Sequence, residues 1–115
     1  MPSLRFPITV FVAQRAAMAL VGWLGLRLSP QLTVPTEPRP FLDTPALDAL
    51  FRWDVGWYAK IAAEGYSDPS SANFWPLFPM LGRAVSMFGV SVPVALVVVA
   101  AVIQLAGLIV LYRLF

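Results

Sequence analysis

The feature that most constrains the fold is an apolar run of twenty residues, 93–112, in which only Gln104 is polar. At about 1.5 Å per residue, a helix of this length measures about 30 Å, which matches the hydrocarbon core of a bilayer. Residues 94–102 are rich in β-branched side chains, but strands seldom exceed about ten residues, so the length favours a helix. The run therefore predicts a transmembrane helix with Pro93 in its first turn and Tyr112 at the interface.

A second apolar run, residues 8–28, has a similar length but contains Gln14 and Arg15. A central arginine costs roughly 2.5–3.5 kcal/mol on insertion, which about six to ten central Leu, Ile, Phe or Val residues can offset. A cleaved signal peptide is the alternative, but the exit after Arg27 lacks the small-x-small pattern of a cleavage site. We therefore expect a retained transmembrane helix.

Composition supports this assignment. The 115-residue chain is 59% hydrophobic and only 12% charged, and all its acidic residues fall between positions 37 and 68. The sequence thus predicts an all-α integral membrane protein with three segments: residues 1–28 with the first span, a loop of residues 29–90 with interfacial helices, and residues 91–115 with the second span.

The residue types that are absent exclude several functions. The chain has no Cys and no His, which excludes disulfides, Cys/His zinc sites and Ser-His-Asp triads. We expect no metal site and no cofactor, although carboxylates leave a divalent metal open. The net charge of +2 comes from scattered arginines rather than a cluster, so a nucleic-acid partner is not expected.

Local signals divide the loop into smaller elements. Residues 29–45 contain five prolines and are expected to be extended. Thr44 and Pro45 can open a helix that continues through residues 48–64 and stops at Gly65. Residues 67–71 are predicted to form a turn, and residues 79–88 a short amphipathic segment that leads into the second span.

The candidate site lies on the predicted helix of residues 48–64. At about 100° per residue, Asp54 shares a strip with Tyr58 and Ile61, beside a strip that contains Trp53, Trp57, Lys60 and Glu64. Tryptophans beside charged side chains are typical of a helix in the headgroup plane of a membrane. Asp54 is then either a helix cap, the simpler interpretation from the residues alone, or a catalytic carboxylate at the water–lipid boundary.

Other polar and aromatic residues also allow two interpretations. Arg52 and Lys60 are either solvated interfacial anchors or ligands of a phosphate group. Arg15 either faces a cavity or partner within the membrane or precedes the true start of the span. Tyr66 is expected to pack. Phe74, Trp75 and Phe78 are expected to form an aromatic interfacial belt rather than a sugar-stacking platform.

Two motifs add a family resemblance. The first is Arg52-Trp53-Asp54-x-x-Trp57-Tyr58-x-x-Ile61-Ala62-x-x-Gly65-Tyr66, and the second is Asn73-Phe74-Trp75-Pro76-Leu77-Phe78-Pro79. Together, over roughly residues 50–87, they resemble the PIG-V-type mannosyltransferases, which include the second mannosyltransferase of glycosylphosphatidylinositol assembly and many bacterial relatives. Trp75 stands where many of these relatives have Phe.

The resemblance implies a GT-C glycosyltransferase fold with many transmembrane helices. It places the amino terminus in the cytoplasm, and residues 29–90 outside a cell membrane that is expected to be bacterial. Asp54 matches the loop aspartate that acts as general base. The implied reaction transfers a hexose, expected to be mannose, from a polyprenyl-phosphate donor to a hydroxyl of a lipid or glycan acceptor. The substrate-binding candidates beside Asp54 are Arg52, Trp53, Trp57, Tyr58 and Lys60.

Members of this family are several times longer than 115 residues. We therefore expect an amino-terminal fragment whose partners include the remaining transmembrane helices of the enzyme, since two helices cannot enclose a lipid-linked sugar. The alternative is a small two-span membrane scaffold, or an inactive remnant without catalysis. Its support is a stripe of small residues suited to close helix packing, Ala19, Gly22 and Gly25.

Overall fold

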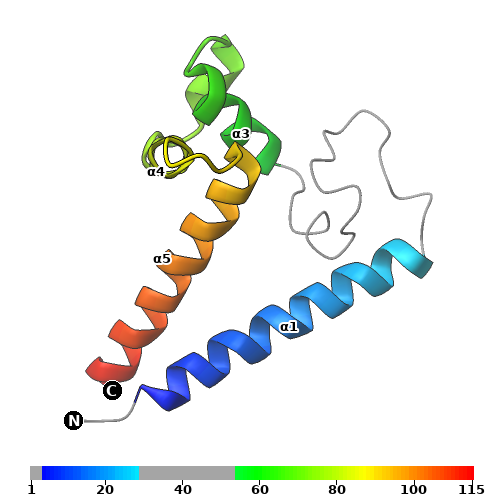
Figure 1. Cartoon of the computed structure of the whole chain (residues 1–115), viewed down its shortest axis with the longest axis vertical. Helices are drawn as coiled ribbons and strands as arrows, with labels where there is room; N and C mark the ends of the chain where they lie inside the picture. Colours follow the sequence, from blue (N-terminus) through cyan, green and yellow to red (C-terminus); the bar gives the residue numbers. More distant parts are fainter. Residues whose placement is uncertain (1–3, 29–53) are drawn as a thin grey trace. The chain divides into compact units, whose positions relative to one another are not determined.

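The computed structural model describes residues 4–28 and 54–115 (Figure 1). Within these ranges the chain forms four α-helices and one 3-10 helix, with no strand, which confirms the predicted all-α class for this part of the chain. The helices are α1 (Arg5–Leu28), α3 (Val55–Glu64), α4 (Leu77–Ser86) and α5 (Val92–Leu114), with the 3-10 helix η2 at Pro69–Asn73. The predicted proline-rich segment, the predicted helix start at Thr44 and Pro45, and residues 48–53 lie outside the described residues.

The two long helices match the two predicted spans. α5 begins one residue before Pro93 and continues two residues beyond Tyr112, while α1 begins three residues before Ile8 and ends at Leu28. Both are long and apolar enough to cross a membrane, by length and composition. The proline in the first turn of each helix, Pro7 or Pro93, removes an N–H that would lack an intrahelical partner in any case.

The structure divides into two compact units, and the first contains α1 and the part of α5 after residue 100. In this unit Gln104 donates a hydrogen bond from its Nε2 to Oε1 of Gln14. The rings of Phe6 and Tyr112 lie 5.6 Å apart. Phe6 precedes Gln14 by eight residues and Tyr112 follows Gln104 by eight, so both contacts belong to one antiparallel register.

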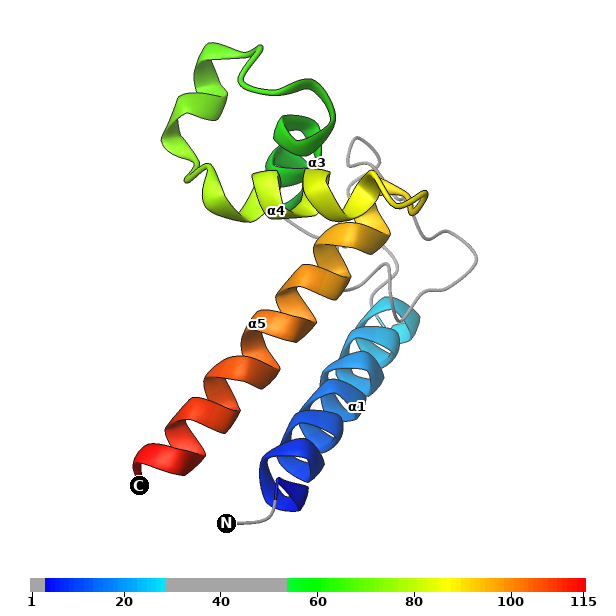
Figure 2. The same ribbon diagram turned by 60° about the vertical axis from the view of Figure 1, so that its left-hand side comes forward.

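The second unit contains α3, η2, α4 and the first turns of α5. Its core consists of buried residues from all three α-helices and from η2: Ile61, Ala62, Ser71, Pro79, Gly82, Ala95, Leu96 and Val99. Figure 2 shows α3 and α4 packed side by side next to the beginning of α5. The two helices approach tightly at Gly82, where an added Cβ would lie 2.5 Å from Cδ2 of Leu96. A glycine in α4 is therefore what allows this contact with α5.

The ends of the short helices follow from their sequences. α3 stops at Gly65, as predicted, because its φ of 76° ends the helix and its N–H caps the carbonyl of Ile61 at 2.8 Å. The turn predicted at residues 67–71 is the start of η2, which Asp68 caps by accepting a hydrogen bond from the N–H of Ser70. The amphipathic segment predicted from residue 79 is α4, which begins two residues earlier, at Leu77.

Candidate functional site

Asp54 stands at the start of α3 with its side chain exposed. A capping aspartate normally has extended backbone angles, which let its carboxylate reach the N–H groups of the first turn. Asp54 instead has helical angles, φ −60° and ψ −17°, and its side chain makes no cap hydrogen bond. The capping interpretation is therefore wrong in this structure, because the Asp54 carboxylate makes no hydrogen bond to the N–H groups of α3.

An aromatic cluster fixes the first turn of α3. The ring of Phe74 stacks on Trp57, with centroids 5.7 Å apart and planes at 20°, and meets Tyr58 edge-on at 5.3 Å. Tyr58 also meets Phe78 of α4 edge-on at 5.1 Å. Tyr58 therefore packs within the protein, and one face of Trp57 is taken up by Phe74. Their contribution to a site is to hold the helix on which Asp54 stands.

The segment after α3 turns Phe74 inward and Trp75 outward. The hydroxyl of Tyr66 donates a hydrogen bond of 2.8 Å to the carbonyl oxygen of Phe74. Phe74 and Phe78 are half-buried, whereas the side chain of Trp75 is 82% exposed. The predicted aromatic belt is thus divided: Phe74 and Phe78 pack inside the unit, and Trp75 alone of the three projects outward.

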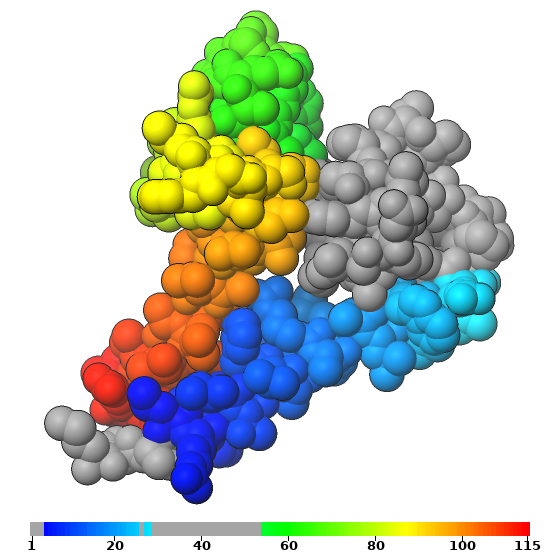
Figure 3. All heavy atoms as spheres, in the orientation of Figure 1, coloured from blue at the N-terminus to red at the C-terminus, as the bar shows by residue number. Residues whose placement is uncertain are grey.

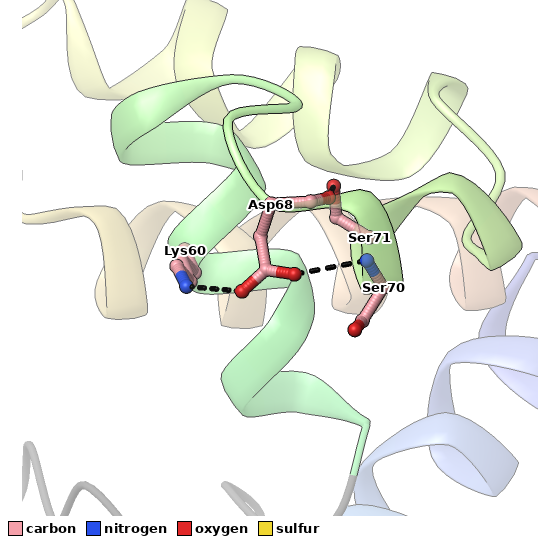
Figure 4. Close-up of polar contacts among 4 residues, drawn as sticks. All are labelled: Lys60, Asp68, Ser70 and Ser71. Atoms are coloured by element: carbon pink, nitrogen blue, oxygen red, sulfur yellow. Dashed lines mark hydrogen bonds and ion pairs between the residues drawn. The ribbon is translucent and has the colours of Figure 1, made fainter.

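Lys60 is held by an ion pair. Its Nζ lies 3.0 Å from Oδ2 of Asp68 and 5.5 Å from the centre of the Trp57 ring. Figure 4 shows that Asp68 also accepts a hydrogen bond of 2.9 Å from the N–H of Ser70, while the hydroxyl of Ser71 lies beside the Asp68 backbone. The N–H of Ser70, followed by Lys60, holds the pKa of Asp68 below its ordinary value. Lys60 thus has a carboxylate partner already, which weakens its candidacy as a phosphate ligand.

The sequence did not single out Asp68 as a partner of Lys60. The local signal was present, because Asp68-Pro69-Ser70 has the pattern of a helix start, with a capping carboxylate followed by proline. The distance of eight residues between Lys60 and Asp68 hides their contact, because the chain reverses at Gly65 between them.

Of the predicted site residues, the structure brings Trp57, Tyr58 and Lys60 together on α3, with Asp54 at its start. Arg52 and Trp53 lie outside the described residues. In residues 4–28 and 54–115, no group of three His, Cys, Asp or Glu side chains could hold a metal ion. In the described part of the chain, the site therefore consists of the exposed carboxylate of Asp54 and the aromatic cluster formed by Trp57, Tyr58, Phe74 and Phe78.

Arg15 is the charged residue near the middle of α1. Its guanidinium lies 5.4 Å from the centre of the Phe11 ring, and its Nε is buried without a hydrogen-bond partner among the described residues. The neighbouring Gln14 makes the contact with Gln104 described above. In the stripe of small residues on α1, a Cβ added at Gly25 meets nothing within 4 Å.

Comparison with protein families, with curated proteins and with solved structures finds no match to this chain. Only its own residues, and the motifs on and after α3, therefore bear on its function.

Proposed function

We propose that this chain is part of an integral membrane glycosyltransferase of the PIG-V type, with α1 and α5 crossing a bacterial cell membrane. The support is the length and apolar composition of both helices, together with the resemblance of the motifs around Asp54 and Trp75. In this arrangement residues 29–90 lie on the extracytoplasmic side. The loop carries α3 and α4 at the membrane surface, where lipid-linked sugars are accessible.

The reaction is transfer of a hexosyl group, mannosyl in our proposal, from a polyprenyl-phosphate donor to a hydroxyl of a lipid or glycan acceptor. Asp54 takes the proton of the acceptor hydroxyl as its oxygen attacks the anomeric carbon. The bond from that carbon to the phosphate oxygen breaks, and polyprenyl phosphate leaves with the bonding electrons. One carboxylate is sufficient as a base, because a phosphate leaving group needs no strong protonation.

One observation carries this proposal: the Asp54 carboxylate is exposed and makes no cap bond, on a helix whose next turn is fixed by aromatic contacts. A general base needs a free carboxylate and a rigid support, because a small displacement from the reacting proton lowers the rate strongly. Phe74 supplies that support by contacting Trp57 and Tyr58, the residues three and four positions after Asp54.

The other candidates take secondary roles. Arg52 and Trp53 immediately precede Asp54 in the sequence and remain candidates for contact with the substrate. Lys60 binds the donor phosphate only if its bond to Asp68 opens. A lipid-linked sugar also needs more enclosure than two spanning helices provide, so further transmembrane helices, in the same polypeptide or in a partner, complete the site.

The experiment is a transfer assay in membranes of the organism that encodes the chain, with and without its gene. The donor is polyprenyl phosphate carrying radiolabelled mannose, and the product is labelled lipid or glycan. We expect deletion to remove one labelled product and re-expression of the gene to restore it. If the labelled products are the same with and without the gene, the glycosyltransferase proposal is wrong, and a scaffold role without catalysis takes its place.

A further inference from the structure

The side of α4 that faces away from the core is apolar along its whole length. Its residues, followed into the turn after the helix, are Leu77, Met80, Leu81, Ala84, Met87 and Phe88, here called the outward face of α4. Leu77, Met87 and Phe88 are 70%, 83% and 89% exposed. The opposite side of the helix carries Pro79 and Gly82, both buried. The fully buried residues of α4 are thus small, and its exposed side carries large apolar residues.

A continuous apolar face of this kind is unusual on a surface in contact with water. Figure 3 shows the atoms of α4 and the following turn, in yellow, at the surface of the second unit in this view. Arg83 is the only charged residue in α4, at the edge of the outward face, and the helix contains no acidic residue. The face therefore fits a partner that is apolar in its interior and carries negative charge at its margin.

The position of α5 directly after α4 indicates that this partner is a lipid bilayer. A turn at residues 87–89 leads from α4 to α5, which begins at Val92 and is long and apolar enough to cross a membrane. Met87 and Phe88 thus lie within five residues of the start of that helix. If α5 enters a bilayer at its first turn, the outward face of α4 lies at the level where acyl chains meet headgroups.

We propose that the outward face of α4 is embedded in the interfacial layer of the bilayer, with its large apolar side chains among the acyl chains and Arg83 at the headgroup phosphates. An amphipathic helix with a cationic margin binds a membrane in this way. The inference rests on the membrane location proposed above and goes beyond it, because it names the surface that touches lipid.

The inference also sets the position of the candidate site. α3 packs against α4 through the contact of Tyr58 with Phe78, away from the outward face. With α4 in the interface, α3 lies on the side of α4 turned toward water. α4 thus acts as the support that keeps α3 and Asp54 out of the hydrocarbon and next to the headgroup phosphates, where a polyprenyl-phosphate donor carries its sugar.

The chain contains no cysteine, so a single introduced cysteine can be labelled selectively. Three exposed alanines provide matched probes: Ala84 on the outward face of α4, Ala63 on α3, and Ala106 within α5. Each variant, A84C, A63C or A106C, is labelled with the fluorophore NBD and reconstituted in vesicles of phosphatidylcholine and phosphatidylglycerol. Quenching by lipids brominated at shallow or deep chain positions then reports depth, and quenching by iodide reports contact with water.

We expect the A84C label to be quenched most by shallow bromines, the A106C label by deep bromines, and the A63C label by iodide. An A84C label that only iodide quenches overturns the inference, as does one that neither lipid nor iodide quenches, because protein then covers the face. In both cases, quenching of the A106C label by brominated lipids shows that the membrane location still holds. If iodide quenches the A106C label as well, the membrane location fails, and the inference fails with it.

Discussion

Gly82 provides the sharpest test of how the second unit is packed. In the variant Gly82→Ala, the new Cβ would lie 2.5 Å from Cδ2 and 3.1 Å from Cγ of Leu96. Leu96 is only 1% exposed, so its side chain has little room to move away. Overpacking of this kind costs about 1–3 kcal/mol. Because alanine favours a helix over glycine by about 1 kcal/mol, the net destabilisation should be about 0–2 kcal/mol.

Gly107→Ala is the matched control. Gly107 also lies inside a helix, but a Cβ added there meets nothing within 4 Å. This variant should gain up to about 1 kcal/mol from helix propensity alone. Unfolding in mixed detergent micelles, followed by circular dichroism as the fraction of dodecyl sulfate rises, gives both free energies. We expect Gly82→Ala to be less stable than Gly107→Ala by about 1–3 kcal/mol.

A double-mutant cycle shows whether Leu96 is the cause. Leu96→Ala alone should cost about 2–5 kcal/mol because it leaves a cavity. Combined with Gly82→Ala, it should cost less than the sum of the two single effects by about 0.5–3 kcal/mol, because the methyl group at position 82 then enters the vacated space. Strict additivity, or a Gly82→Ala variant as stable as Gly107→Ala, would refute the packing of α4 on α5 described above.

Three further predictions follow from the described contacts. Phe74→Ala removes two aromatic pairs, each worth about 0.5–1.5 kcal/mol beyond area burial, and should destabilise the second unit in the same micelle titration. Trp75 is exposed, so Trp75→Ala should change the free energy of unfolding by less than about 0.5 kcal/mol. The pKa of Asp68 is lowered in the folded state, so its stabilising contribution is present above about pH 4 and lost as the pH falls further. The protection factors for amide hydrogen exchange in residues 66–74, which compare the observed rate with the intrinsic rate at each pH, should therefore fall on acidification in the parent chain. Asp68→Asn should remove this loss of protection. In a double-mutant cycle of unfolding free energies, Gln14→Leu and Gln104→Leu should show a coupling energy of about 0.6–2 kcal/mol. A coupling energy of zero would contradict the contact between the two side chains.

Much of the helical architecture could be predicted from local sequence. The length of the run ending at Tyr112 gave α5 to within two residues at each end, and Gly65 marked the end of α3 correctly. These features depend on hydrophobic length and on single-residue backbone preferences, which a sequence displays directly.

The features that were missed depend on tertiary contacts. The residue type of Asp54 favours a helix cap, and only the observed backbone angles show that its carboxylate is not used as one. The bond from Lys60 to Asp68 requires the chain to reverse between them, and the inward turn of Phe74 depends on its fit against Trp57 and Tyr58. Sequence periodicity gives the face on which a residue lies but not the partner it meets.

The central claim is that Asp54 is the general base of a sugar transfer, and its most direct test is the chromosomal variant Asp54→Asn. Asparagine keeps the shape of the side chain but cannot accept the proton, and Asp68→Asn serves as the control because Asp68 is already paired with Lys60. The measurement is mannose transfer from polyprenyl phosphate in membranes, together with the amount of membrane-inserted protein. We predict that Asp54→Asn loses transfer by about 10²–10⁴-fold at normal insertion, while Asp68→Asn retains most of it. Transfer by Asp54→Asn at the parental rate would contradict the account.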